Sequence, residues 1–142
     1  MTFSQNLYIL KTSKIKEEGF KMTTEQKFFI CKHCGNLVGM LFNSGAKLVC
    51  CGDEMTELVA NTSDGAQEKH VPVIKVEGSK VTVSVGSVPH PMLPEHHIAW
   101  IYLQTSAGGH RKALEIGSKP ETCFMLCENE KPIAAFAYCN LH

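Results

Sequence analysis

The first group of residues that could do chemistry is a set of four cysteines in the N-terminal half of the chain. Cys31 and Cys34 form a C-x-x-C motif, and Cys50 and Cys51 are adjacent. A C-x-x-C turn lets both sulfurs face one ion while backbone N–H groups point at them. Neighbours on an extended strand face opposite sides, so Cys50 and Cys51 can share that ion only if the chain bends between them, and Gly52 gives it room. The motif predicts one four-thiolate site with a distorted tetrahedron.

Four thiolates suit both iron and zinc, so the spacing leaves three interpretations of this site open. The site could hold iron, it could be a structural zinc ribbon, or Cys50 and Cys51 could form a disulfide without any metal. His33, inside the C-x-x-C loop, is expected to be a surface residue.

A second group of candidate ligands is spread along the C-terminal part of the chain. Its members are His70, His90, His96, Cys139 and His142. Pro89 and Pro91 restrict the backbone around His90, so this side chain would lose little entropy on binding a metal. Four imidazoles and one thiolate leave a six-coordinate ion with one open position, which on a redox metal implies chemistry on a small ligand. The thiolate would push electron density onto that metal.

The composition favours metal sites over disulfides and argues against several other classes of protein. Seven cysteines and seven histidines among 142 residues are unusual, and an odd cysteine number without a signal peptide favours metal ligands in a reducing cytoplasm. The 14 basic and 14 acidic residues cancel, and no basic stripe or long apolar run suggests nucleic acid or a membrane as partner. Two further histidines are expected to be ordinary solvated residues: His97 and His110.

The chain that must position these ligands divides into three parts. Residues 1–24 have no clear period and are expected to be a poorly ordered extension. The codons of residues 16–22 could spell a purine-rich ribosome-binding site and an initiator, so we expect Met22 to be the native start. Native protein that begins at Met1 in N-terminal mass spectrometry would contradict this. Residues 25–61 are too few to form a stable fold without a bound structural metal.

Residues 62–142 have the pattern of an all-β sandwich, with short strands separated by Gly and Pro turns. The expected strands are 71–76, 81–85, 98–103, 111–116, 122–127 and 133–138. The last two are expected to pair with each other across a turn at residues 128–131. Cys123 and Cys127 lie four apart and are expected to be small buried apolar residues.

Taken together, these motifs resemble one family, the desulfoferrodoxins, which are two-iron superoxide reductases. The resemblance covers residues 28–142 and adds two further stretches to the cysteine motifs. These are Glu68-Lys69-His70 and the run from Gly86 to Met92, with His96 six residues past His90. The family normally continues past its last ligand with a glycine and a short aromatic, basic tail, whereas this sequence stops at His142.

The resemblance implies a desulforedoxin-like module with a rubredoxin-like iron held by four cysteines, followed by an immunoglobulin-like β-sandwich with a second iron. In that second centre four histidines would be equatorial (His70, His90, His96 and His142) and Cys139 would be axial. Lys69 would attract superoxide and orient a proton-carrying water, and Glu68 would bind the oxidised iron once peroxide has left. Without the resemblance, Glu68 and Lys69 would be an ordinary solvated charge pair.

The function implied by the resemblance is one-electron reduction of superoxide to hydrogen peroxide, with electrons from a rubredoxin-like donor. The resemblance also favours a homodimer in the cytoplasm. A second hypothesis, from another class, is a non-catalytic metalloprotein that acts as an electron carrier or a zinc-ribbon interaction module. Metal content and colour would separate the two.

Overall fold

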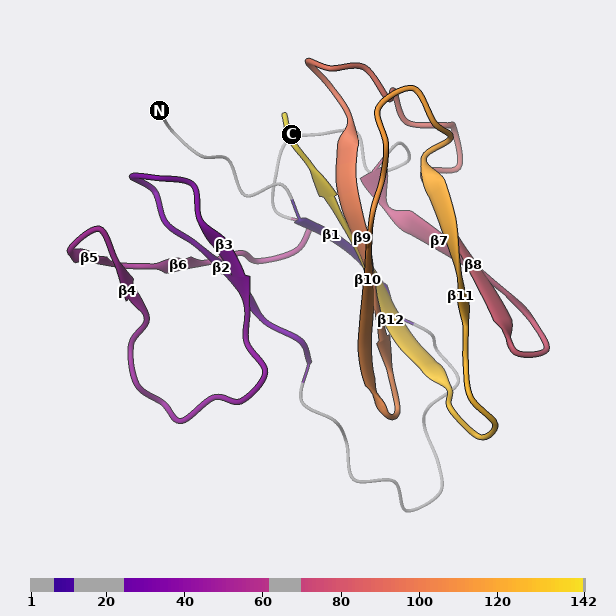
Figure 1. Ribbon diagram of the computed structural model, residues 1–142, viewed down its shortest axis with the longest axis horizontal. Helices are drawn as coiled ribbons and strands as arrows, with labels where there is room; N and C mark the ends of the chain where they lie inside the picture. The colour runs from indigo at the N-terminus through magenta and orange to yellow at the C-terminus, as the bar shows by residue number, and fades with distance from the viewer. Residues whose placement is uncertain (1–6, 12–24, 62–69, 142) are drawn as a thin grey trace.

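The computed structural model describes residues 7–11, 25–61 and 70–141 (Figure 1). These residues form twelve strands: β1 (Leu7–Lys11), β2 (Phe28–Ile30), β3 (Leu37–Gly39), β4 (Val49–Cys50), β5 (Asp53–Glu54), β6 (Thr56–Glu57), β7 (Pro72–Glu77), β8 (Lys80–Val85), β9 (Ile98–Thr105), β10 (Gly108–Ala113), β11 (Glu121–Met125) and β12 (Pro132–Cys139). In the part of the chain that the structure describes, no helix is long and apolar enough to cross a membrane.

The larger part of the molecule is a sandwich of two antiparallel sheets. One sheet has the order β1-β12-β9-β10 and the other the order β11-β8-β7 (Figure 1). Alternate residues of β8 point inward, and Val81, Val83 and Val85 are almost fully buried. Ile101 and Leu103 of β9 meet them from the other sheet in the same core cluster. The expected all-β class, a small metal module followed by a sandwich, is therefore confirmed.

The pairing expected for the last two strands is wrong. β11 pairs with β8, whereas β12 pairs with β9 and β1, so the two strands belong to different sheets. The turn between them crosses from one layer to the other, and Leu126 N–H bonds to Ser79 O at 2.8 Å. Alternation along a strand predicts its faces but does not say which neighbour it pairs with.

The two cysteines near that turn do not share one environment. Cys123 lies half-buried in β11, while Cys127 lies beyond the end of the strand and is exposed. The expectation that both are buried is therefore wrong for Cys127, because β11 ends at Met125, and Cys123 is only partly buried.

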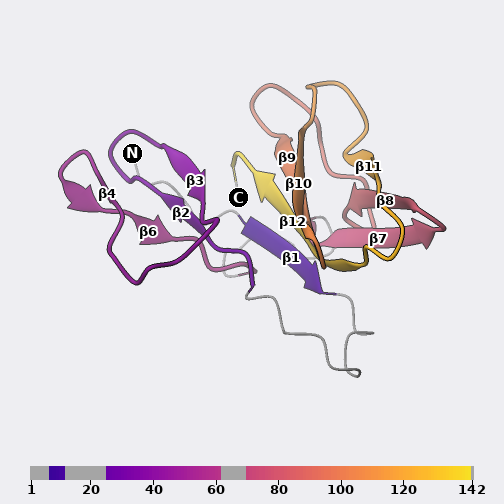
Figure 2. The same cartoon turned by 60° about the horizontal axis from the view of Figure 1, so that its bottom comes forward.

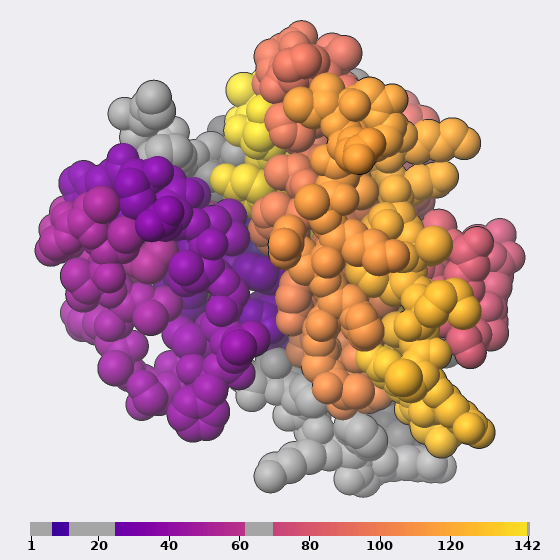
Figure 3. Space-filling model, viewed as in Figure 1, coloured from indigo at the N-terminus to yellow at the C-terminus, as the bar shows by residue number. Residues whose placement is uncertain are grey.

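Residues 25–61 form a separate lobe, called here the four-cysteine module, which packs against one side of the sandwich (Figure 3). It contains a three-stranded sheet of order β3-β2-β6 and the hairpin β4-β5. Phe28 and Ile30 of β2 are buried in a second core cluster, together with Phe136 of β12. The centroid of the Phe28 ring lies 5.2 Å from the ring centroid of Trp100 and 5.3 Å from that of Phe136. This aromatic contact joins the module to the sandwich.

The expectation of a poorly ordered extension over residues 1–24 is wrong for residues 7–11, which form β1. This strand pairs antiparallel with β12, with Leu7 opposite Tyr138 and Lys11 opposite Ala134. Figure 2 shows β1 alongside β12, on the side nearer the four-cysteine module. The strand has only five residues and four of them are apolar in a row. It therefore shows no period that would predict a strand from the sequence.

Candidate metal centres

The four-cysteine site is built from one loop and one hairpin turn. Cys31 directly follows β2 and begins the C-x-x-C loop, while Cys50 and Asp53 face each other in the β4-β5 hairpin. The two residues between them, Cys51 and Gly52, have φ angles of 52° and 81°. Positive φ at both positions is the geometry of the tightest hairpin turns. The expected bend between Cys50 and Cys51 is therefore present, and it turns both sulfurs to the same side.

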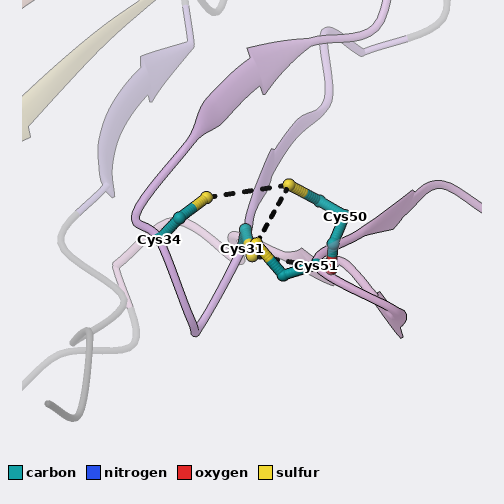
Figure 4. A group of neighbouring side chains, drawn as sticks. All are labelled: Cys31, Cys34, Cys50 and Cys51. Atoms are coloured by element: carbon teal, nitrogen blue, oxygen red, sulfur yellow. Dashed lines mark hydrogen bonds between the residues drawn. The ribbon is translucent and has the colours of Figure 1, made fainter.

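The four sulfurs converge on one another (Figure 4). Cys34 Sγ lies 3.7 Å from Cys50 Sγ, and Cys50 Sγ lies 4.0 Å from Cys51 Sγ. All four sulfurs lie within 4.8 Å of one another, and each cysteine is a free thiol. Because tetrahedral Zn–S and Fe–S sites hold their sulfurs at about this spacing, the donor set fits a single metal ion. The alternative of a disulfide between Cys50 and Cys51 is not found.

The thiols of this site differ in how readily they lose a proton. Backbone N–H groups, that of Cys34 first, lower the pKa of Cys31 to about 6. Hydrogen bonds from the neighbouring thiols, Cys34 foremost, raise the pKa of Cys51 to about 12. One thiolate therefore forms easily, while four close sulfurs become thiolates together only when a cation balances their charge.

Two polar contacts that the motif alone did not reveal support this site. His33 is exposed, as expected, and its Nε2 contacts the carboxylate of Asp53, which ties the C-x-x-C loop to the hairpin. Asn36 Nδ2 donates to Cys50 Sγ at 3.6 Å. A carboxylate two residues past a Cys-Cys pair is a signal that could have been read from the sequence.

The second site lies where four separate segments reach the same end of the sandwich. His70 precedes β7, His90 follows β8, His96 precedes β9 and Cys139 ends β12. Because β7 with β8 and β9 with β12 run antiparallel, the start of one strand lies beside the end of its partner. The fold therefore brings together residues that are far apart in the sequence.

These four residues are called here the His/Cys site. Each offers one ligand atom, a ring nitrogen or a sulfur, and these atoms all lie within 4.8 Å of one another. His70, His90 and Cys139 are buried, and His96 is half-buried. The His90 ring lies 4.6 Å from both the His70 ring and the His96 ring, tilted steeply to each. Three imidazoles and a thiol at this spacing suit a transition metal such as iron.

His90 is held in one tautomer. Its Nδ1 lies 2.7 Å from the carbonyl oxygen of Pro91, and because a carbonyl only accepts, Nδ1 carries the proton. Nε2 is then the nitrogen that faces the site, 3.5 Å from Cys139 Sγ. A second partner that fixes the tautomer of a ligating histidine is the usual arrangement around protein-bound metals.

Asn140, which sequence reasoning did not single out, connects the Cys139 segment to the His96 segment. Its Oδ1 accepts from His97 N–H at 2.7 Å, its Nδ2 donates to Glu95 O at 3.2 Å, and its own N–H donates to His97 O at 3.1 Å. These bonds surround His96 on both sides in the chain. His97 itself turns its Nδ1 to Leu93 O at 3.0 Å, so the expectation that His96 and not His97 joins the cluster agrees with the structure.

Three of the residues expected at the second site lie outside the described residues: Glu68, Lys69 and His142. His110 is not part of either cluster and instead contacts Glu130 at 2.9 Å.

The fold and the two clusters define a class of all-β protein with a four-thiolate centre in a small module and an imidazole-thiolate centre in a sandwich. A sequence model described as Desulfoferrodoxin matches residues 62–142, and one described as its N-terminal domain matches residues 23–58. The chain belongs to the desulfoferrodoxin family.

Individual relatives agree with this assignment. The desulfoferrodoxin of Nitratidesulfovibrio vulgaris is 44% identical over 121 residues, which cover 85% of this chain and 94% of the relative. The superoxide reductase of Pyrococcus horikoshii is 36% identical over 105 residues, which cover 62% of this chain and 91% of the relative. Among solved structures, the superoxide reductase from Treponema pallidum is similar with a TM-score of 0.71 and 39% identity, over 84% of this chain and 95% of that one.

Proposed function

We propose that this chain is a superoxide reductase, an oxidoreductase that converts superoxide, one electron and two protons into hydrogen peroxide without forming dioxygen. The observation that carries the proposal is the His/Cys site, in which three imidazoles and one buried thiol converge at one end of the sandwich. Membership of the desulfoferrodoxin family and the similarity to proteins named superoxide reductase support it.

The proposed ligands of the two iron ions are the residues of the two clusters. Cys31, Cys34, Cys50 and Cys51 would hold one iron, and His70, His90, His96 and Cys139 would hold the other together with His142. When bound, the second iron supplies the electron that reduces superoxide. Around it, Pro91 fixes the tautomer of His90, and burial of Cys139 keeps the thiolate away from water.

Glu68 and Lys69 are proposed as the catalytic residues that would lie beside the second metal. Lys69 would attract the superoxide anion and orient the water that carries a proton to it. Glu68 would occupy the metal after peroxide leaves. Both precede His70 directly in the sequence, which supports their proximity to the site.

The remaining parts of the proposal concern the setting of the reaction. We propose two domains, residues 25–61 and 62–142, which the two family matches support, since they meet between residues 58 and 62. An external rubredoxin-like donor would return the electron, and the protein would act as a homodimer in the cytoplasm. The four-cysteine centre would either relay electrons or stabilise the fold.

Metal analysis combined with visible spectroscopy and pulse radiolysis tests this function on the native protein. We expect two irons per chain, absorption from two different thiolate–iron centres, and fast second-order consumption of superoxide with peroxide as the product. A colourless protein that holds zinc would favour a non-catalytic metalloprotein and refute the reductase.

A further inference from the structure

β1 is an element of this chain that neither family match contains, because the matches begin at residue 23 while the strand covers Leu7–Lys11. Successive residues of a strand point to opposite sides. Leu7 and Ile9 accordingly belong to the core cluster that holds Phe28 of the four-cysteine module. Tyr8 points the other way and belongs to the sandwich core cluster that holds Cys139. One strand therefore contacts both parts of the molecule.

The Tyr8 ring lies directly against one side of the His/Cys site. It is stacked on the ring of His70, with 4.6 Å between the ring centroids and 22° between the planes. Tyr8 has no exposed surface, so the contact is made away from water. Its partner across the ladder is Ala137, two residues before Cys139. Tyr8 thus lies close to two of the proposed ligands.

The backbone of β1 is held on both of its edges, so the position of the Tyr8 ring is well defined. β12 pairs with one edge along the whole strand. On the other edge, Asn61 N–H donates to Leu7 O at 2.8 Å, and Asn61 Oδ1 accepts from Ile9 N–H at 3.1 Å. Asn61 Nδ2 also donates to Ile9 O at 3.3 Å. Because its backbone is held on both edges, β1 can keep the Tyr8 ring in one position against His70.

We propose that Tyr8 is a positioning residue for His70: by stacking on the imidazole, it restricts the ring to the plane in which its nitrogen faces the metal. The inference rests on the proposed function to the extent that His70 binds the iron. An aromatic ring packed on an imidazole limits rotation about the Cβ–Cγ bond, and the two rings prefer an offset stacked arrangement. Groups that orient a ligating histidine affect both metal affinity and the electronic properties of the site.

Three variants of the chain that begins at Met1 test this inference, since a protein that began at Met22 would lack β1 and Tyr8. Tyr8→Leu removes the ring but leaves an apolar side chain, while Tyr8→Phe keeps the ring. Ile9→Ala is the matched control, because Ile9 lies on the same strand but packs on the opposite side, against the four-cysteine module. Each iron-loaded protein is examined by the EPR signal of the His/Cys site and by the rate at which a chelator removes its iron. The four-cysteine signal serves as an internal reference.

In Tyr8→Leu we expect a changed EPR anisotropy at the His/Cys site and roughly ten-fold faster iron loss, at the low end of the effect of removing a group that orients a ligand. Tyr8→Phe and Ile9→Ala should match the native protein. Unchanged signals in Tyr8→Leu would overturn the inference, and so would equal changes in Tyr8→Leu and Ile9→Ala, since the whole strand would then be responsible.

Pulse radiolysis of the native protein keeps the two proposals apart. Native protein that binds iron at the His/Cys site but does not reduce superoxide would refute the proposed function and leave the positioning role of Tyr8 testable by EPR and iron release. Native protein that binds no iron at that site would overturn both.

Discussion

Cys139 is fully buried at the last position of β12, and its sulfur lies 3.5 Å from His90 Nε2. Buried thiols are usually inert, whereas this one is placed beside three imidazoles. The neighbouring Asn140 holds its segment to that of His96 through bonds to Glu95 and His97. The site therefore combines a sulfur that water does not reach with a backbone that these hydrogen bonds connect.

Cys139→Ser should abolish superoxide reduction even where iron stays bound. A hydroxyl is a much poorer donor than a thiolate, so the electron density that the sulfur supplies would be lost. The rate should fall by more than the roughly 10- to 100-fold that loss of an outer-shell partner costs. Pulse radiolysis and the thiolate–iron absorption band measure the two effects. Cys123→Ser, a half-buried thiol outside both clusters, is the control and should keep full activity.

Lys69→Ala should slow the second-order reaction with superoxide at low salt and leave iron binding unchanged. The net charge of the chain is zero, so a local cation has to supply any attraction for the anion, on the order of ten-fold in capture rate. Rising ionic strength should slow the native protein more than the variant, since screening acts on an attraction that the variant lacks. Equal rates and equal salt slopes of the variant and the native protein in pulse radiolysis would show Glu68 and Lys69 to be a plain solvated pair.

At the scale of elements, the carboxylate of Glu130 connects the strands at the end of the sandwich where β9 finishes. Glu130 accepts from Thr105 Oγ1 at 2.5 Å, contacts His110 Nε2 at 2.9 Å and accepts from Cys127 N–H at 3.1 Å. These partners belong to β9, β10 and the turn after β11. The hydrogen bond from Thr105, followed by that from His110, lowers the pKa of Glu130 to about 2.

The contacts of the Glu130 carboxylate predict that the thermal stability of the protein depends on pH. A carboxyl whose pKa is lower in the folded chain stabilises the fold above its ordinary pKa, and that contribution is lost as pH falls toward the folded value. The native protein should therefore lose thermal stability between about pH 4.5 and pH 2 more steeply than Glu130→Gln. Differential scanning calorimetry across this range measures the difference. Glu128→Gln, an exposed neighbour on the same turn, is the control and should follow the native curve.

Residue spacing predicted the sites better than it predicted the arrangement of the strands. Cys31, Cys34, Cys50 and Cys51 lie within 21 residues, and a ligand set of that kind needs only a local bend. The pairing of β11 with β8 depends on which sheet each strand joins, and this is decided by long-range packing. β1 was missed because its short apolar run has no readable period and because the partners that hold it in place, β12 and Asn61, lie far away in the sequence.

For the whole molecule, the two centres belong to different parts with different ligands, so they should be separable. Cys34→Ser should remove the absorption of the four-cysteine centre and leave superoxide reduction largely intact. The measurement pairs the visible spectrum with pulse radiolysis on the same sample. If both were lost together, the first centre would be an obligatory relay, or the fold would depend on it through the aromatic contact of Phe28 with Trp100.

The pairing of β1 with β12 also has a consequence for the order of events during biosynthesis. β1 leaves the ribosome before the other described strands and pairs with β12, which leaves after them, so the main sheet stays incomplete until β12 has emerged. The four-cysteine ligands all lie before residue 52 and can meet while translation continues. The His/Cys cluster has to wait for Cys139 at the end of β12. Nascent chains should therefore acquire metal at the first centre co-translationally and at the second only after β12 is released.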